Sequence, residues 1–364
     1  HTQIWTYTMK KITLKQLAEL SGTSIGTVDR ALHGRGRINS ETRDKILRIA
    51  DEYNYAPNIM ASTLSRKKTY RIGIIMAEFP DEFCRHLKHG IEDAAAFLQS
   101  YSFTYDFLIT SSLAEDAQMS VINRLDTSLY DAFLVNAGSD SVAQWIRKMS
   151  DEGKIIATFN SNSRGSGQTF YVGEDPYKAG QLMGNYICNV IPDLRSLVIL
   201  KGFQSNYSHI QRCLGVKSVV VENNPSAQIY EYEYFDDENT AREITDSFIK
   251  KGEKIDAFFS SSGAGTAGIG KALSSADFPL HSKIFGYDVT KATIELMKQN
   301  LCLGVIFQDP YQQSYNGMKM LIEHLVLNTK LERKNYYIRS RLLLKSNAEE
   351  YLYDQKEENN RYLI

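Results

Sequence analysis

A short run near the N-terminus carries side chains suited to contacting a nucleic acid. Ser24, Ile25, Gly26 and Thr27 would form the first turn of a helix, with Arg30 one turn further along. An arginine fork can donate two parallel hydrogen bonds to a guanine, and serine and threonine hydroxyls suit phosphate oxygens. Gly26 offers no side chain, which leaves its neighbours to make the base contacts. An ordinary helix with a solvated arginine is the alternative interpretation.

Asp29 is unusual in such a run, because its carboxylate repels phosphate. It would either accept a hydrogen bond from a cytosine amino group or orient Arg30. The residue types therefore predict that Ile25, Asp29 and Arg30 dominate base readout.

Three short amphipathic segments would hold this run in place. Thr13 and Gln16 have the spacing of a capping box that opens a first helix, and Gly22 would end that helix. A second helix would cover residues 25–32, and a third would open at Ser40. Three short helices with a tight glycine-containing turn are typical of a helix-turn-helix unit, whose second helix lies in the major groove.

The charge of the chain is divided unevenly along its length. The 364 residues have a net charge of −1, yet residues 9–69 contain 12 Lys and Arg against 6 Asp and Glu. A basic head on an acidic body indicates that the head meets a polyanion. Because twofold operators are bound by twofold proteins, we expect a homodimer on double-stranded operator DNA.

Composition argues against several other classes of protein. No run of about 18 apolar residues could span a membrane, and no apolar segment with a small-residue cleavage site marks a secretory signal. The four cysteines are scattered without a C-x-x-C pair, which argues against a zinc site and a disulfide framework. We therefore expect a cytoplasmic chain without a membrane partner, a metal or a cofactor.

From Tyr70 onward the pattern changes to apolar strands that alternate with amphipathic helices. This alternation is typical of parallel α/β sheets with helices on both faces. A stretch of about 275 residues exceeds one such sheet, so two α/β lobes with a cleft between them are expected. The predicted strands are Arg71–Met76, Tyr105–Ile109, Ala132–Val135, Ile155–Phe159, Leu197–Leu200, Ala257–Ser260, Ile284–Tyr287 and Leu303–Phe307.

One glycine-rich segment supports a rival function. Residues 263–268 spell G-x-G-x-x-G after a predicted strand, and Asp288 follows about twenty residues later, as in a dinucleotide-binding fingerprint. This is the best argument for an NAD-dependent oxidoreductase. Against it, the segment comes late in its domain and the helix-turn-helix head would be unexplained. A helix packed closely on a sheet also favours small residues.

Other rivals are weaker. Ala272 replaces the hydroxyl that a P-loop needs for magnesium, no G-x-S-x-G elbow occurs, and no histidine pair has metal-ligand spacing. We therefore expect no catalytic residue. A solute-binding protein of a transport system would have an export signal and no DNA-binding head, and this chain shows the reverse.

The head resembles a known family of regulators. Residues 12–30 closely resemble the DNA-binding head of the LacI/GalR repressor family, and Asn54–Asn58 is similar to its Asn-Tyr-x-Pro-Asn junction. The family usually has serine at the position of Asp29, which leaves the operator sequence open. The residues expected to contact DNA are Thr13, Ser24, Ile25, Gly26, Thr27, Asp29, Arg30, Tyr55, Asn58, Ala61 and Leu64.

The resemblance also implies a hinge helix after Asn58 that enters the minor groove, where Leu64 would wedge between base pairs. The segment is too short to be helical alone, and an apolar wedge can kink a flexible step. A core contact between Leu64 and the following domain is the alternative.

The rest of the chain resembles the type I periplasmic sugar-binding fold. Val172–Asp175 with Gly180, Arg212 with Gly215, and Phe285–Asp288 match landmarks of that fold. Ligands of open α/β sheets bind outside the carboxyl ends of the strands. The expected ligand-binding residues are Glu78, Phe79, Phe83, Asn136, Asn160, Ser161, Arg212, Phe235, Ser262, Asp288 and Gln308.

This mixture of amides, carboxylates, an arginine fork and aromatic faces suits a polyol. Phe83 matches the position where sugar-binding relatives stack an aromatic ring on the sugar. Asn160 and Ser161 stand where many sugar binders have Asp-Arg, and Ser262 where many have asparagine, so the effector is left open.

The sequence thus predicts an all-α helix-turn-helix head followed by a two-lobed α/β sensor of the type I periplasmic-binding-protein kind. The expected function is a transcriptional regulator, of the repressor type, whose operator binding is controlled by a sugar-like effector. Whether the effector releases DNA or tightens binding is left open. The expected boundaries are an extension at 1–8, the head at 9–56, a hinge at 57–69, the sensor at 70–345 and a tail at 346–364.

Overall fold

A computed structural model describes residues 12–33, 36, 38–53, 68–78, 81–163, 165–276 and 281–352. The chain separates between Lys68 and Thr69 into two units. The predicted hinge with Tyr55, Asn58, Ala61 and Leu64 lies outside the described residues.

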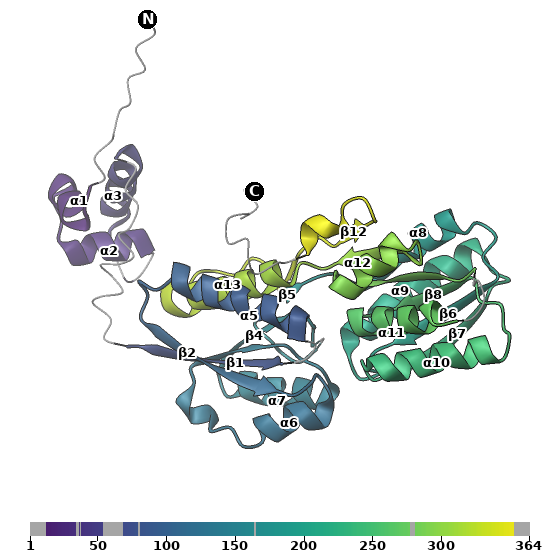
Figure 1. Cartoon of the computed structure of the whole chain (residues 1–364). Coiled ribbons are helices and arrows are strands. Elements are labelled where there is room, and N and C mark those ends of the chain that lie inside the picture. The colour runs from purple at the N-terminus through teal and green to yellow at the C-terminus, as the bar shows by residue number, and fades with distance from the viewer. Residues whose placement is uncertain are drawn as a thin grey trace, which may run out of the picture. The chain divides into compact units, whose positions relative to one another are not determined.

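The first unit is a bundle of three helices, α1 (Leu14–Ser21), α2 (Ile25–His33) and α3 (Ser40–Glu52) (Figure 1). One apolar side chain from each helix is fully buried at their meeting point: Leu17, Val28 and Ile46. The predicted helix-turn-helix arrangement is therefore confirmed, and its helices are held by the apolar positions that the sequence spacing indicated.

The cap of the first helix follows the sequence prediction. Gln16 N donates to Thr13 Oγ1 at 3.2 Å, and Thr13 N donates to Gln16 Oε1 at 2.8 Å, which makes a complete capping box. Gly22 ends the helix in the left-handed conformation at φ +68°, where a side chain would be strained. The third helix begins at Ser40 as predicted, although Asn39 supplies the cap.

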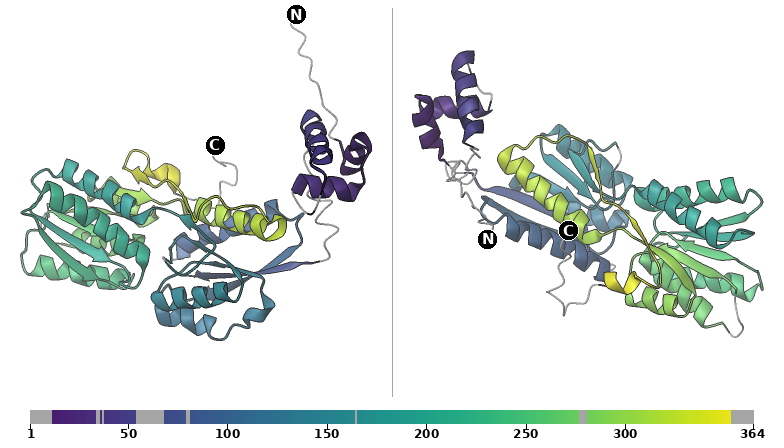
Figure 2. Two further views of the ribbon diagram at one scale, coloured as in Figure 1. Left: turned by 180° about the vertical axis from the view of Figure 1, so that it is seen from behind. Right: turned by 90° about the horizontal axis from the view of Figure 1, so that it is seen from above.

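The second unit contains two six-stranded sheets with helices on both faces (Figure 2). The strand order in the first sheet is β11-β5-β4-β3-β1-β2, and all neighbours are parallel. Its strands are β1 (Tyr70–Ala77), β2 (Phe103–Thr110), β3 (Ala132–Val135), β4 (Ile155–Phe159), β5 (Phe170–Gly173) and β11 (Asn335–Tyr337).

The second sheet has the order β12-β10-β9-β8-β6-β7. Its neighbours are parallel except for β12, which pairs antiparallel with β10 at the sheet edge. Its strands are β6 (Ser196–Lys201), β7 (Gln228–Glu233), β8 (Ala257–Ser260), β9 (Lys283–Tyr287), β10 (Cys302–Phe307) and β12 (Arg341–Leu343). The prediction of parallel sheets is correct apart from this edge strand.

Each sheet is sandwiched between two layers of helices. Apolar residues of α5 and α13 pack on one face of the first sheet, and those of α6 and α7 pack on the other. The second sheet is covered by α8 and α9 on one face and by α10, α11 and α12 on the other. The helices are α5 (Asp81–Phe97), α6 (Glu115–Ile122), α7 (Asp140–Asp151), α8 (Pro176–Val190), α9 (Tyr207–Asn223), α10 (Glu238–Lys250), α11 (Gly263–Ser274), α12 (Lys291–Lys298) and α13 (Pro310–Leu327).

The chain crosses between the two lobes at three described places. β5 of the first sheet leads through Glu174 into α8 of the second lobe, and β10 of the second sheet leads through Gln308 into α13 of the first. The third crossing joins β11 to β12 and contains Ser340. One of these crossing residues, Gln308, bonds to Asn160 after β4 of the first sheet and to Asp288 after β9 of the second, so the carboxyl ends of strands from both sheets lie near it.

All eight predicted strands are present, but four others were missed: β5, β7, β11 and β12. The landmark segment Val172–Asp175 is the end of strand β5 followed by the Asp175 cap of α8. Residues beyond the expected sensor boundary at 345 also join the second core, since Ala348 is buried there.

Candidate functional site

The predicted DNA-contacting run of the head lies at the start of α2. Ser24, Ile25, Gly26 and Arg30 are exposed there, and Ile25 shows 48% of its surface although the other apolar residues of this helix are covered. An exposed branched apolar side chain at the start of a helix suits a thymine methyl group. The predicted DNA-contacting run is therefore accessible in the structure.

Two hydrogen bonds position the Arg30 side chain along its own helix. Its Nε donates to the Gly26 carbonyl oxygen at 3.0 Å, and Nη2 lies 3.5 Å from Thr27 Oγ1. Thr27 and Ser24 hydroxyls are 2.9 Å apart. Asp29 is half-buried, and the exposed Thr13 side chain is used by the α1 cap.

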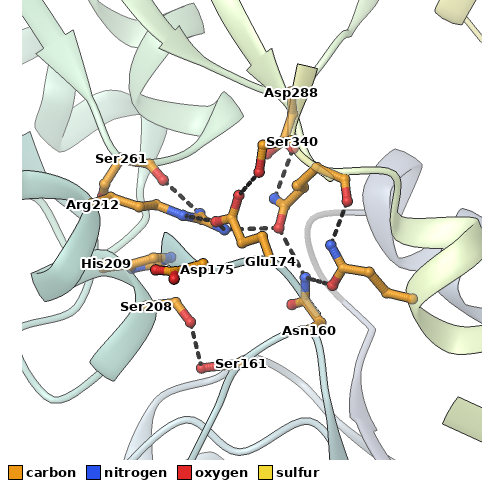
Figure 3. A network of polar contacts seen from close by, with 12 residues as sticks. Asn160, Ser161, Glu174, Asp175, Ser208, His209, Arg212, Ser261, Asp288 and Ser340 are labelled. Carbon is orange, nitrogen blue, oxygen red and sulfur yellow. Dashed lines mark hydrogen bonds and ion pairs between the residues drawn. The ribbon is translucent and has the colours of Figure 1, made fainter. Parts of the chain in front are cut away.

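In the larger unit, a buried polar network is centred on Arg212 of α9 (Figure 3). Arg212 Nε donates to Glu174 Oε1 at 2.6 Å, Nη1 donates to the Ser261 carbonyl oxygen at 2.8 Å, and Nη2 donates to Gln308 Oε1 at 2.7 Å. The guanidinium also lies 4.1 Å from the centre of the Tyr287 ring. The arginine fork is therefore engaged on every side by protein groups.

Gln308 extends this network toward the strand ends of both lobes. Its Nε2 donates to Asp288 Oδ1 at 2.9 Å, just after β9. Its Oε1 accepts from Asn160 Nδ2 at 3.0 Å, just after β4. Asn160 also donates to Gln313 Oε1 at 3.1 Å, and Asn136 Nδ2 lies 3.4 Å from Asn160 Oδ1. The network thus joins the carboxyl ends of strands from both sheets.

Backbone geometry explains part of the residue choice at these strand ends. Asn160 and Asp288 have φ values of +59° and +63°. Asparagine and aspartate tolerate this left-handed conformation better than other non-glycine residues. The same side chains therefore serve the turn and present polar atoms to the network.

Two smaller polar clusters flank the network. Ser161 Oγ donates to Asn206 Oδ1 at 3.2 Å and lies 3.5 Å from Ser208 Oγ, which links the end of β4 to the start of α9. Ser262 Oγ donates to Asp236 Oδ1 and lies 2.5 Å from the Tyr234 hydroxyl.

Burial shifts the protonation of several groups in this region. It raises the pKa of Asp288 to about 6, against the opposing effect of Arg212. It also lowers the pKa of His209, at the start of α9, to about 4, so this imidazole is neutral near pH 7. Burial would lower the pKa of Arg212, but the charge of Glu174 outweighs it and holds the guanidinium protonated.

Family models match both units of the chain. Residues 13–58 match the bacterial regulatory proteins of the lacI family, and residues 72–329 match a periplasmic binding protein domain. The chain belongs to the LacI family of bacterial regulatory proteins. It is a DNA-binding transcriptional regulator whose larger unit is a periplasmic binding protein domain.

Individual relatives of this LacI-family regulator are similar to it over the head, the sensor or both. It is 21% identical over 323 residues to catabolite control protein A of Priestia megaterium, covering 86% of this chain and 92% of that relative. It is 30% identical over 124 residues to the Streptococcus mutans protein of the same name, covering 34% of this chain and 36% of that relative. A solved glucose-galactose binding protein from Geobacillus stearothermophilus has a TM-score of 0.70 and 19% identity, over 77% of this chain and 99% of that chain, which shows the sensor fold.

The structure brings together only part of the residue set predicted for the sensor of this LacI-family member. Asn136, Asn160, Arg212, Asp288 and Gln308 share the network, and Ser161 and Ser262 lie in the flanking clusters. Arg212 lies within a helix, although it was considered with the strand ends.

The ligand contacts of the other four predicted residues stay predictions. Glu78 is exposed after β1, and Phe83 is half-buried against the core of the first lobe. Phe235 is 58% exposed in the segment after β7. Phe79 lies outside the described residues.

Sequence reasoning missed several members of the network. Glu174 was noticed only as part of a family landmark, and Ser261, Gln313 and Ser340 were not considered. Ser261 follows β8 directly, so the strand-end rule could have found it. Ser340 has no comparable signal, because it lies between two strands of three residues each.

The glycines of the rival dinucleotide fingerprint have a packing role in this LacI-family sensor. A Cβ added at Gly268 would collide with the Glu238 carbonyl oxygen of α10, and one at Gly265 with Ser260 Oγ. These glycines let α11 approach its neighbours closely. The oxidoreductase alternative is therefore not favoured.

The described residues contain neither a metal-ligand cluster nor a helix suited to spanning a membrane. No three His, Cys, Asp or Glu side chains come together there as a metal site. None of its helices combines the length and apolarity that crossing a membrane requires.

Proposed function

We propose that this regulator binds a polyhydroxyl effector, a sugar or a close relative, between its two lobes, and that the effector controls operator binding by a cytoplasmic homodimer. The observation that carries the proposal is the polar network, which draws Asn136 and Asn160 from one lobe and Arg212 and Asp288 from the other. Hydroxyl groups both donate and accept hydrogen bonds, so a polyol matches a site made of amides and a carboxylate.

Burial supports a site that depends on lobe movement. Asn136, Asn160, Arg212 and Gln308 are each at most 6% exposed. A ligand therefore reaches them only if neighbouring segments move. Because Glu174, Gln308 and Ser340 lie on the crossings between the lobes, a ligand that rearranges their hydrogen bonds changes the geometry at those crossings.

Control of DNA binding requires that the effector bind two states of the protein unequally. We propose that the lobes change their separation when the effector binds and that the hinge after Asn58 transmits the change to the heads. The protein then acts as a repressor, with two heads on two half-sites of one operator. The name of the structural relative, a glucose-galactose binding protein, supports a sugar as the first ligand to test.

A ligand screen on the full chain tests the proposal. Thermal unfolding would be followed with glucose, galactose, ribose, ribitol and myo-inositol, and with NADH as a contrast. At 100 times the Kd, a ligand specific for the native state stabilises it by about 2.7 kcal/mol, which is a measurable shift.

Two variants locate the binding site in this screen. Asn160→Ala should abolish the shift caused by the sugar hit. Glu152→Gln, at the exposed C-terminal end of α7, should leave that shift unchanged. A shift with NADH alone, or a sugar shift that survives Asn160→Ala, would contradict the proposal.

A further inference from the structure

We infer that the effector is uncharged, because Glu174 already neutralises the arginine of the site. This inference rests on the proposed function and specifies the ligand class of the same site. An arginine between two lobes would ordinarily suit a carboxylate or a phosphate, which it binds through paired hydrogen bonds. In this protein the carboxylate that pairs with Arg212 is Glu174 of the same chain.

The contacts of the guanidinium leave it little capacity for a ligand. Nε bonds to Glu174, Nη1 to the Ser261 carbonyl oxygen, and Nη2 to Gln308. One face of the group is covered by the Tyr287 ring at 4.1 Å. Nη2 also lies 2.5 Å from Glu174 Oε1, so these contacts occupy four of the five N–H donors of the group. A bidentate bond to an anionic ligand needs two donors and would require one of these protein partners to leave.

Glu174 is itself fixed in place. Its side chain is fully buried, and its second carboxylate oxygen accepts from Ser340 Oγ at 3.0 Å. It lies on one crossing between the lobes and Ser340 lies on another. Displacing this carboxylate would leave an unpaired charge in the interior, which is strongly unfavourable.

The charge that remains near the site is negative. Asp288 adds a carboxylate that is hydrogen-bonded to Gln308, while Arg212 and Glu174 cancel each other. A ligand carboxylate or phosphate would therefore face a like charge without a free cation to offset it, which costs affinity. An ammonium group would be attracted by Asp288, but among the described residues this carboxylate already accepts from Gln308, so the amine would have to replace that bond and lose its water.

A second, independent observation points to a ligand that donates hydrogen bonds. Asn136 is 1% exposed, and its Oδ1 has no hydrogen-bond partner among the described residues. A buried acceptor left unsatisfied is costly, and a hydroxyl group can donate to it. The oxygens of a carboxylate or a phosphate dianion cannot. A hydroxyl of the ligand thus suits this position, while the exclusion of an anionic group rests on the ion pair of Arg212 and Glu174.

Matched ligand series test the inference by calorimetry on the full chain. The probes are glucose with glucuronate and glucosamine, galactose with galacturonate and galactosamine, ribose with ribose 5-phosphate, and ribitol with ribonate. In the series that binds, we expect the neutral member to bind at least about thirtyfold more tightly than its acid or phosphate, since like-charge juxtaposition costs on the order of a hundredfold in affinity.

Two variants assign the selectivity to Glu174. Glu174→Gln keeps the shape of the side chain and removes its charge. The affinity of the neutral ligand divided by that of its acid should then fall about tenfold, because the acid binds more tightly. Ser340→Ala removes the hydroxyl that bonds to the same carboxylate but keeps the charge, so the ratio should stay close to that of the wild type.

The outcomes separate this inference from the function on which it rests. A wild-type protein that prefers an acid, a phosphate or an amine overturns the inference and leaves the sugar-type effector standing. A folded Glu174→Gln variant with an unchanged ratio also overturns it. If Glu174→Gln does not fold, the wild-type ratios alone decide. Binding of none of the probes contradicts the proposed function itself.

Discussion

Arg212 Nε lies 2.6 Å from Glu174 Oε1, and both side chains are buried. This pair joins helix α9 of one lobe to a segment that crosses to the other, and Gln308 and Ser340 connect it to the remaining two described crossings. The ion pair is therefore placed where a small rearrangement affects all three connections. Its contribution to the stability of the sensor and its effect on ligand selectivity can be measured separately.

Removing one partner of the pair should destabilise the sensor strongly. Arg212→Met leaves Glu174 charged and buried, and breaking a buried pair in this way costs about 3–5 kcal/mol. Urea unfolding followed by the fluorescence of Trp145, which packs against Phe133, measures the free energy of unfolding. The matched control is Arg71→Met in the solvent-exposed pair with Asp106, which should cost about 1 kcal/mol or less. Equal costs for the two variants would refute the structural role given to Arg212.

Asp288 should make the stability of the sensor depend on mildly acidic pH. Burial raises its folded-state pKa to about 6, above that of the unfolded chain. A raised pKa means that the folded state holds the proton more tightly than the unfolded chain does. The protonated group therefore adds its full contribution to the free energy of unfolding below the unfolded pKa, and this contribution is lost as pH rises through about 6. Because the side chain is only half-buried, we expect the free energy of unfolding to fall by about 1 kcal/mol between pH 4 and 6 from this group.

Asp288→Asn tests that expectation, because the amide does not titrate. The difference in unfolding free energy between the wild type and this variant should change over the same pH range. A difference that stays constant across the range would show that Asp288 keeps an ordinary pKa in the folded protein.

Arg30 should contribute sequence-specific contacts to DNA. Arg30→Ala is expected to cost about 1–3 kcal/mol at one base position and to relax specificity there. Selection of operator sequences by the wild type and the variant measures the change position by position. Arg48→Ala, at an exposed position of α3, is the control and should not alter preference at any single position. A uniform loss across all sequences in Arg30→Ala would reassign this residue to phosphate contact.

The glycine-rich segment offers a test between packing and nucleotide binding. Gly268→Ala should destabilise the sensor by about 1–3 kcal/mol, because the added methyl group collides with α10. Gly263→Ala should be tolerated, since the nearest atom to its added Cβ is Asp288 Cβ at the ordinary distance of 3.4 Å. A dinucleotide fingerprint would need both glycines, so an NADH-induced thermal shift that both variants abolish would favour the oxidoreductase reading.

Local signals made much of the fold predictable from the sequence. The capping box of Thr13 and Gln16 involves residues three positions apart, and strands such as Ala132–Val135 are continuous apolar runs. The missed strand β7 is an exposed edge strand with glutamates among its residues, so its apolar pattern is interrupted. Strands β11 and β12 are only three residues long, and their pairing depends on partners far away in the chain.

The candidate site was predictable only where it follows strand ends. Asn136, Asn160 and Asp288 come directly after strands, and the rule for open α/β sheets finds them. The bond between Glu174 and Ser340 spans 166 positions of sequence, and no local pattern reveals it. Phe83 was predicted from the position where sugar-binding relatives stack an aromatic ring, and the structure packs it, half-buried, against the core of the first lobe. Phe235 is exposed, and the ligand contacts of both residues stay predictions.

Operator binding by the full chain, measured by fluorescence anisotropy with and without the sugar identified in the screen, tests the central claim most directly. The account predicts that the sugar changes the operator Kd by about 5- to 150-fold, the usual range of coupling between two sites. It also predicts that Asn160→Ala removes this response while its operator Kd without sugar stays that of the wild type. A sugar that binds but leaves the operator Kd unchanged, or a response that persists in Asn160→Ala, would contradict it.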